Sequence, residues 1–117
     1  MKKEEISYFQ YDIDIRLLEK QIKKNINEFD NIYAFKRGGW PIAVHLSHLL
    51  KLPIIDCKDI TERTLIVDDV SDTGKTLIEA GIPYKQIAVL YRKDGTKVEP
   101  RFFARTINEY IVYHWEV

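Results

Sequence analysis

Cysteine is nearly absent from this sequence, and so are long apolar runs. A single cysteine among 117 residues, Cys57, excludes an intrachain disulfide and is typical of proteins from reducing compartments. No apolar run approaches the length that a membrane span needs. The first five residues, MKKEE, lack the apolar centre of a signal peptide. We therefore expect a cytoplasmic protein that makes no membrane contact.

The chain also lacks a net charge. Eighteen Lys and Arg residues balance eighteen Asp and Glu residues, whereas proteins that bind nucleic acid usually carry a clear basic excess. This balance argues against a nucleic-acid partner but leaves room for a local basic patch. A hydrophobic content of 45% over 117 residues is enough for one core. Because no linker or repeat divides the sequence, we expect a single domain over residues 1–117.

One stretch organises the rest of the chain. Residues 65–77 read LIVDDVSDTGKTL: the apolar run predicts a buried strand, and the small polar residues predict a loop that opens a helix. Loop amides and a helix dipole suit a phosphate group. The paired carboxylates of Asp68 and Asp69 suit sugar hydroxyls or a hydrated Mg²⁺. This one segment therefore offers the two features that a sugar phosphate requires.

Apolar spacing predicts alternating helices and strands. Steps of three and four predict an amphipathic helix over residues 13–29, and Pro41 suits the first turn of a second helix. The first twelve residues are expected to form an edge strand or an arm. Strands are predicted at 31–35, 52–56, 65–70, 86–91 and 110–114, with a short helical piece at 76–80. This alternation predicts an α/β fold with a mostly parallel sheet.

Two loops that suit anions follow strands of this sheet. Gly38-Gly39 comes after the strand at 31–35, and Ser71–Thr76 comes after the central strand. In parallel sheets, ligands bind beyond the carboxyl ends of the strands, at a topological switch point. Two such loops at one edge predict a ligand with two phosphate groups.

Gly74-Lys75-Thr76 resembles the end of a nucleotide-triphosphate loop, but that pattern needs a glycine five positions before the Gly-Lys pair. Asp69 stands there, and its carboxylate would repel phosphate. The stretch instead resembles the signature of the type I phosphoribosyltransferases, which is a hydrophobic strand, two acids and an Asp-Thr-Gly-x-Thr loop. The resemblance implies a three-layer, doubly wound α/β fold with a mostly parallel sheet and a small hood from the chain termini.

The resemblance also implies a ligand, phosphoribosyl pyrophosphate. Asp68 and Asp69 would take its ribose hydroxyls, directly or through water bound to Mg²⁺. The 5-phosphate would be held by Ser71, Asp72, Thr73, Gly74, Lys75 and Thr76. The alternative for the acid pair is a helix cap or surface turn, although two carboxylates that end a buried strand are costly without a ligand or cation.

Arg37-Gly38-Gly39 resembles the pyrophosphate loop of the family. Glycine exposes main-chain amides to an anion, and the Arg37 guanidinium can pair with phosphate oxygens. The alternative is an ordinary turn before a helix. In the family reaction, Mg²⁺ and this loop stabilise the leaving pyrophosphate. Asp72 stands where the family places a general base near purine N7, and its alternative is an Asx-type turn.

The last third of the chain resembles the 6-oxopurine branch of the family, in its xanthine-guanine and hypoxanthine forms. By that resemblance, Lys93 donates to the 6-oxo group, Tyr110 stacks on the purine and the Ile111 main chain reads its edge. Trp115 and Glu116 would shape the end of the pocket. The alternative is that Tyr110 and Trp115 are core aromatics. The implied reaction is purine salvage, which forms a nucleoside monophosphate and pyrophosphate.

One departure from the family leaves the function open. The family carries a long mobile loop before the signature strand, whereas this chain has only residues 57–64. A neighbouring subunit could cover the site, since family members often dimerise. The enzyme could also be slow, or the protein could sense phosphoribosyl pyrophosphate or a nucleotide without transferring anything. Three histidines and Cys57 suggest no metal site or catalytic thiol, because further ligands and a basic setting are not evident.

Overall fold

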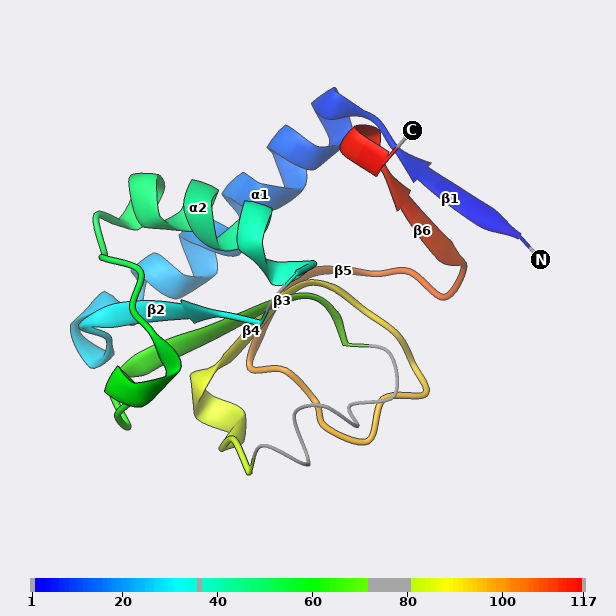
Figure 1. Ribbon diagram of the computed structural model, residues 1–117. Helices are drawn as coiled ribbons and strands as arrows, with labels where there is room; N and C mark the ends of the chain where they lie inside the picture. The colour runs from blue at the N-terminus through cyan, green and yellow to red at the C-terminus, as the bar shows by residue number, and fades with distance from the viewer. Residues whose placement is uncertain (1, 36, 72–80, 117) are drawn as a thin grey trace.

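A four-stranded parallel sheet forms the centre of the protein (Figure 1). The computed structural model describes residues 2–35, 37–71 and 81–116. The strands are β2 (Asn31–Ala34), β3 (Thr64–Ser71), β4 (Ile87–Arg92) and β5 (Phe102–Thr106), and they lie in this order. All three neighbouring pairs are parallel, as the sequence predicts.

Two helices cover one face of this sheet (Figure 1). They are α1 (Tyr8–Lys23) and α2 (Gly39–Leu50), and they pack on each other and on the strands. Their buried side chains join those of β3 and β4 in the main core, with members such as Leu18, Leu46, Val67 and Leu90. A smaller cluster around Ile66, Ile87 and Val89 packs against Ile82, Val98 and Phe103. The helix expected at residues 76–80 lies outside the described residues, as do residues 1, 36, 72–75 and 117.

The two chain ends meet in a second, two-stranded sheet. Strand β1 (Lys3–Ile6) pairs in parallel with β6 (Tyr110–Tyr113), and a short 3₁₀ turn, η4 (His114–Glu116), follows β6. Figure 1 shows this pair standing apart from the four-stranded sheet, beyond one end of it. It is the small hood from the chain termini that the family resemblance implies, and we call β1, β6 and η4 the hood.

The predicted first helix is wrong at both ends. It begins at Tyr8 instead of residue 13, because the Ser7 side chain accepts a hydrogen bond from the Gln10 main chain and caps it. It ends at Lys23 rather than at residue 29, and Phe29 is buried after the helix has stopped. Apolar spacing in this region therefore continued past the helix into a 3₁₀ turn, η1 (Ile26–Glu28).

The predicted strands differ from the observed ones at two places. Residues 52–56 form only an isolated bridge between Ile32 and Ile54, and the 3₁₀ turn η2 (Cys57–Asp59) follows them. Strand β5 was not predicted, because the charged residue Arg105 interrupts its apolar pattern. Arg105 lies there because its charge is paired with a buried carboxylate on α1. A further 3₁₀ turn, η3 (Tyr84–Gln86), leads into β4.

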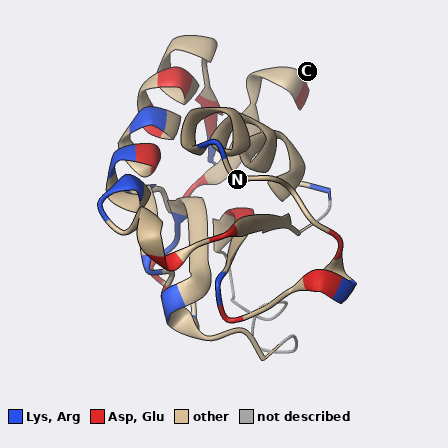
Figure 2. Cartoon of the chain, turned by 90° about the vertical axis from the view of Figure 1, so that its left-hand side faces the viewer, with Lys and Arg blue, Asp and Glu red and all other residues tan. Residues whose placement is uncertain are grey.

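Two further expectations can be compared with the described chain. Figure 2 shows acidic and basic residues interspersed along it, as the balanced composition suggests. None of the helices within the described residues has the length and apolar character to cross a membrane.

Candidate active site

The loop after β2 packs directly on the carboxyl end of β3. A Cβ atom placed on Gly39 would lie 2.5 Å from the Val67 carbonyl oxygen and 3.0 Å from the Asp68 Cα. A Cβ on Gly38 would lie 2.5 to 2.7 Å from the carboxyl atoms of Asp69. Real Cβ atoms do not approach other atoms this closely, so position 39 requires glycine, and a side chain at position 38 would have to displace the Asp69 carboxyl group. The fold therefore joins the two loops that the sequence predicted separately.

The acid pair ends the buried part of β3. The Asp69 main-chain amide donates to Asp68 Oδ1 at 2.8 Å, and the Val70 amide donates to Asp69 Oδ1 at 3.0 Å. Burial raises the pKa of Asp68 to about 8, and the neighbouring Asp69 carboxyl adds to this rise. The two carboxylates thus crowd each other where a cation or a set of hydroxyl donors would relieve the repulsion.

We expect the free energy of unfolding of the ligand-free protein to fall as the pH rises from about 4 to about 8. Asp68 has an ordinary pKa of 3.8, but in the fold it keeps its proton to about 8. Between these values the folded state holds the extra proton, so raising the pH costs up to about 1.4 kcal/mol per pH unit. Thermal unfolding between pH 5 and 8 measures this slope. Asp68→Asn is expected to flatten it, and an unchanged slope in that variant would contradict the assignment.

The oxygen atoms of the acid pair are of the kind that suits a magnesium ion held jointly by the protein and a ligand. Mg²⁺ prefers oxygen ligands and commonly binds through one or two carboxylates together with substrate phosphates and water. Over the described ranges, no group of three or more His, Cys, Asp or Glu side chains is placed to hold a metal. Asp68 and Asp69 would therefore supply part of a coordination shell and leave the rest to a ligand.

Ser71 is the last residue of β3, and it lies beside Lys93, which directly follows β4. The Lys93 main-chain amide donates to the Ser71 carbonyl at 3.1 Å. The Ser71 side chain is buried, and its hydroxyl has no hydrogen-bond partner among the described residues. The predicted phosphate-loop residues Asp72, Thr73, Gly74, Lys75 and Thr76 lie outside the described residues. Lys93 is therefore fixed beside the start of the predicted phosphate loop.

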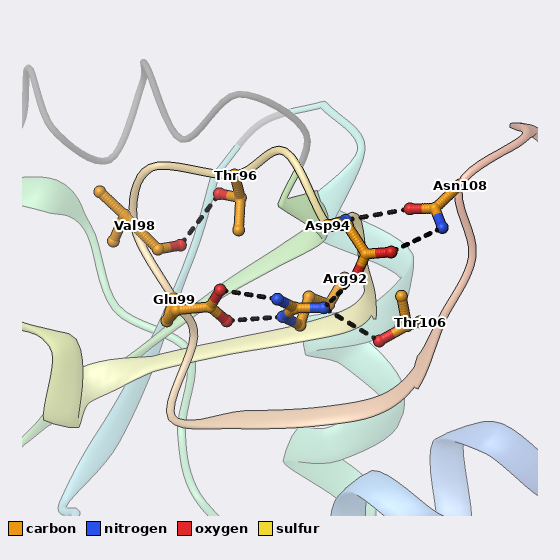
Figure 3. Close-up of polar contacts among 7 residues, drawn as sticks. All are labelled: Arg92, Asp94, Thr96, Val98, Glu99, Thr106 and Asn108. Atoms are coloured by element: carbon orange, nitrogen blue, oxygen red, sulfur yellow. Dashed lines mark hydrogen bonds and ion pairs between the residues drawn. The ribbon is translucent and has the colours of Figure 1, made fainter.

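A polar network holds the turn that carries Lys93 (Figure 3). The Arg92 guanidinium donates to both carboxyl oxygens of Glu99 at 2.5 and 2.7 Å, and to Asp94 at 2.9 Å. Asp94 and Asn108 exchange two further hydrogen bonds of 2.9 Å. Residues before and after Lys93 are thus fixed by charge-assisted contacts, which limits how far the lysine main chain can move.

A hollow of about 680 Å³ opens between the α2 N-terminus and the hood. Its walls are Arg37, Gly38, Trp40, Pro41, Trp115 and Glu116. Arg37, which the sequence assigned to pyrophosphate, therefore faces the same space as Trp115 and Glu116, which it assigned to the base. Trp40 also lines a second hollow of about 460 Å³, beside residues 54–58. The sequence did not single out Trp40.

The other predicted base contacts are divided between surface and core. Tyr110 is 53% exposed at the start of β6, where its amide donates to the Lys2 carbonyl. Ile111 is buried in the main core. Neither Tyr110 nor Lys93 is among the described residues that line the larger hollow. The structure thus brings Trp115 and Glu116 to the pyrophosphate loop but does not place Tyr110 against Lys93.

Within the part of the chain that the structure describes, no histidine or cysteine belongs to a group of three or more possible metal ligands. His45 is hydrogen bonded to the Tyr11 hydroxyl, and burial lowers its pKa, with further lowering from His48 and His114. Cys57 is exposed on η2.

The short loop before β3 is held against the body of the protein. Arg63 pairs with both carboxyl oxygens of Asp30 at 2.9 and 3.1 Å. The Gln86 side chain donates to the main-chain oxygens of Thr61 and Thr64, at 2.8 and 3.0 Å. A loop so short and so tied cannot extend over the acid pair as a lid. The shortened loop that the sequence indicated is therefore also a fixed one.

Tyr113 is a contact of the site that sequence analysis missed. Its hydroxyl donates to the Asp69 main-chain oxygen at 3.3 Å, and its ring stacks on Trp115. The sequence contained a signal, since Tyr113 lies two residues before Trp115 in the run that resembles the purine branch. It reads as an apolar strand residue, however, and the contact with β3 depends on where the hood folds.

Solved structures resemble this chain over its whole length. A purine phosphoribosyltransferase from Pyrococcus horikoshii Ot3 is 30% identical with a TM-score of 0.83, over 100% of this chain and 95% of that one. A xanthine-guanine-hypoxanthine phosphoribosyltransferase from Helicobacter pylori is 23% identical with a TM-score of 0.80, over 99% and 93%.

A hypothetical protein from Neisseria gonorrhoeae, solved with bound ppGpp, is 20% identical with a TM-score of 0.76, over 100% and 92% of the two chains. No protein-family model matches the sequence. The two neighbours below 25% identity support the fold alone. The match to the Pyrococcus enzyme, at 30% identity over nearly all of both chains, also shows the family. The chain belongs to the type I phosphoribosyltransferase family.

Proposed function

We propose that this protein transfers the 5-phosphoribosyl group of phosphoribosyl pyrophosphate to a 6-oxopurine base. The observation that carries the proposal is the packing of Gly38 and Gly39 on the end of β3. This contact puts a loop suited to pyrophosphate beside two carboxylates suited to ribose hydroxyls. A ligand with a sugar between two phosphate-bearing ends matches that arrangement.

The parts of the ligand are assigned as follows. The Gly38 amide and the Arg37 guanidinium hold the pyrophosphate. Gly39 lets the loop approach β3 closely, while its own amide donates to the Phe35 carbonyl. Asp68 and Asp69 hold the ribose hydroxyls, in part through Mg²⁺-bound water. The 5-phosphate binds the loop at Ser71–Thr76. The buried Ser71 hydroxyl, which lacks a partner among the described residues, is at the start of that loop and needs an acceptor or donor.

Transfer replaces the bond between the anomeric carbon and pyrophosphate by a bond to a purine nitrogen. Positive charge develops on the sugar, and negative charge develops on the leaving group. Arg37 and the Gly38 amide stabilise that negative charge, and Mg²⁺, when bound, adds charge stabilisation at the pyrophosphate. Asp72 accepts the proton that purine N7 loses as the other nitrogen of the five-membered ring bonds to the sugar. Positioning both substrates in line supplies much of the remaining rate.

A purine acceptor is favoured by two features. The hollow between Arg37 and Trp115 is bounded by two indole rings, which suit a flat heterocycle. The similar structures from Pyrococcus and Helicobacter act on purines according to their names. We assign Lys93 to the 6-oxo group, and Tyr110, Ile111, Trp115 and Glu116 to the walls of the base site. Tyr110 would have to approach from the exposed side of β6.

Nucleotide formation from guanine, hypoxanthine and xanthine, each with phosphoribosyl pyrophosphate and Mg²⁺, tests the proposal. We expect product with at least one base, and pyrophosphate in equal amount. Asp72→Asn is expected to lower turnover at least about a hundredfold while leaving the affinity for phosphoribosyl pyrophosphate nearly unchanged. Binding of phosphoribosyl pyrophosphate without product from any base would refute the transferase.

A second candidate is a nucleotide-sensing protein on the same fold. The fixed loop at 57–63 favours it, because an enzyme that excludes water needs a cover that this loop does not provide. The similar Neisseria protein was solved with ppGpp, a nucleotide that carries two pyrophosphate groups. Calorimetry with ppGpp and with guanosine monophosphate separates the candidates. A sensor would bind ppGpp tightly and form no nucleotide from any base.

We further propose that the protein forms a homodimer through α1. Phe9, Ile13 and Leu17 are spaced by four on this helix, and 80%, 54% and 42% of their respective surfaces are exposed. Because Ile15, Leu18 and Ile22 are buried on the opposite side, α1 is apolar on both faces. Helices of that kind are usually covered on both sides, and two copies can cover each other about a two-fold axis.

Ile13→Arg is expected to shift the protein from dimer to monomer. It places a charge at the centre of the exposed stripe and should weaken association at least about tenfold. Light scattering coupled to size-exclusion chromatography gives the mass of both proteins. The matched control is Ile60→Arg, at an exposed isoleucine outside α1, which should stay dimeric. A monomeric wild-type protein at micromolar concentration would refute the interface.

A further inference from the structure

Tyr113 connects the hood to the acid pair. It lies at the end of β6 with 3% of its surface exposed, and its hydroxyl donates to the main-chain oxygen of Asp69 at 3.3 Å. Burial raises the pKa of Tyr113 above its ordinary value, so the phenol remains a hydrogen-bond donor over the working pH range. Through this hydrogen bond, the side chain of a hood residue contacts the main chain of β3.

The ring of Tyr113 is the middle member of an aromatic stack. Trp115 lies parallel to it, with centroids 4.5 Å apart and planes 7° apart. Tyr91 of β4 also stacks with it, at 6.0 Å and 24°. One end of the stack thus forms a wall of the hollow that Arg37 also lines, and the other end lies in the core.

The core end of this stack is fixed by charge. The Tyr91 hydroxyl donates to Asp14 at 2.5 Å, and the Arg105 guanidinium lies over the Tyr91 ring, 5.5 Å from its centroid. Arg105 also pairs with the fully buried Asp14 at 3.0 Å. Because Tyr91 is held in this way, a displacement of Asp69 would be absorbed by Tyr113 and by the exposed end of the stack, Trp115.

We propose that Tyr113 is a positioning residue that transmits occupation of the acid pair to the Trp115 wall of the base site. The inference rests on the proposed function, because it takes Asp68 and Asp69 to bind the sugar. A ligand on these carboxylates shifts the Asp69 peptide, whose oxygen holds the Tyr113 hydroxyl. The Tyr113 ring turns with it, and Trp115, parallel and in contact, follows. Sugar-phosphate binding thereby sets the base site.

Trp115 fluorescence tests this transmission. The chain has two tryptophans, so Trp40→Phe leaves Trp115 as the sole indole. Ribose 5-phosphate with Mg²⁺ is the probe, because it lacks the pyrophosphate that would reach the hollow. In the Trp40→Phe parent we expect a saturable change in Trp115 emission that follows the binding curve measured by calorimetry.

Tyr113→Phe in this parent keeps the stacked ring and removes only the hydroxyl. Since that hydroxyl touches no ligand, we expect calorimetric affinity within about fivefold of the parent and loss of the emission change. Tyr91→Phe is the matched control. It removes a buried hydroxyl from the same stack and should lower stability. It should keep the emission change, because the ring at position 91 stays buried in the core beneath the Arg105 guanidinium.

The possible outcomes separate the inference from the function. An emission change that persists in Tyr113→Phe, or that is absent from a parent that binds the probe, overturns the inference. Loss of calorimetric binding in Tyr113→Phe but not in Tyr91→Phe also overturns it, because Tyr113 would then act in binding itself. A parent that gives no heat of binding contradicts the proposed function, and the inference falls with it.

Discussion

Gly39→Ala is expected to destabilise the protein by about 3 kcal/mol or more. The new methyl group would lie 2.5 Å from the Val67 carbonyl oxygen and 3.0 Å from the Asp68 Cα. Val67 is paired with β2 on one side and with β4 on the other, and its carbonyl oxygen also accepts from the Phe35 amide. This part of the strand therefore cannot move aside without breaking main-chain hydrogen bonds. The cost is therefore larger than for ordinary overpacking against a side chain. For a domain of this size the melting temperature should fall by about 10 °C or more.

Gly38→Ala is expected to behave differently. Its methyl group would meet the Asp69 carboxyl atoms at 2.5 to 2.7 Å, and a side chain can rotate away. Stability should then change by about 1 kcal/mol or less, while binding of phosphoribosyl pyrophosphate with Mg²⁺ is lost because the carboxylate is displaced. Thermal unfolding and calorimetry on the same samples measure the two effects separately.

Gly95→Ala is the control for both variants, since no atom lies within 4 Å of the added Cβ. It should leave stability and binding nearly unchanged. If Gly39→Ala proved as stable as the wild type, the close packing of the loop on β3 would be wrong, and the assignment of the site would lose its main support.

Asp14→Asn is expected to cost about 3 kcal/mol of unfolding free energy. Asp14 is fully buried and accepts hydrogen bonds from Tyr91, Gln10 and Arg105. The amide keeps the shape but removes the charge that compensates Arg105, and it offers one acceptor oxygen where the carboxylate offers two. Urea unfolding of both proteins gives the difference directly.

Two controls isolate the cause of this loss. Asp12→Asn removes an exposed partner of Arg16 on the same helix, and surface pairs of this kind contribute about 0 to 1 kcal/mol. The triple variant Asp14→Leu, Arg105→Met and Tyr91→Phe replaces the acid and two of its three partners by apolar groups, and it leaves Gln10 in place. It should recover most of the stability, as apolar replacement of buried ion pairs often does. A triple variant as unstable as Asp14→Asn would show that shape, rather than charge, sets the loss.

The chemical groups of the candidate site could be predicted from the sequence because they belong to residues that are adjacent along the chain. Asp68 and Asp69 follow an apolar run, and the two glycines of the predicted pyrophosphate loop stand at the start of a helix with Pro41 in its first turn. Strand periodicity and helix starts are local properties of the chain, so β2, β3 and β4 were predicted close to their observed bounds. The acids and the glycine loop could therefore be assigned to the same edge of a parallel sheet before their contact was known.

The long-range contacts that connect these segments could be seen only in the tertiary structure. No local pattern shows that Arg105 lies opposite Asp14, so the strand that carries it was missed. The first helix was likewise predicted to extend past Lys23, because Phe29 continues the helical spacing of apolar residues. Phe29 is buried by long-range packing, however, after the helix has ended. The contact of Tyr113 with Asp69 spans 44 positions and arises only when both chain ends fold into the hood. The sequence by itself determined the groups that suit a sugar phosphate, through residues adjacent along the chain. Their spacing from the Trp115 wall depends on long-range packing, which only the folded structure determines.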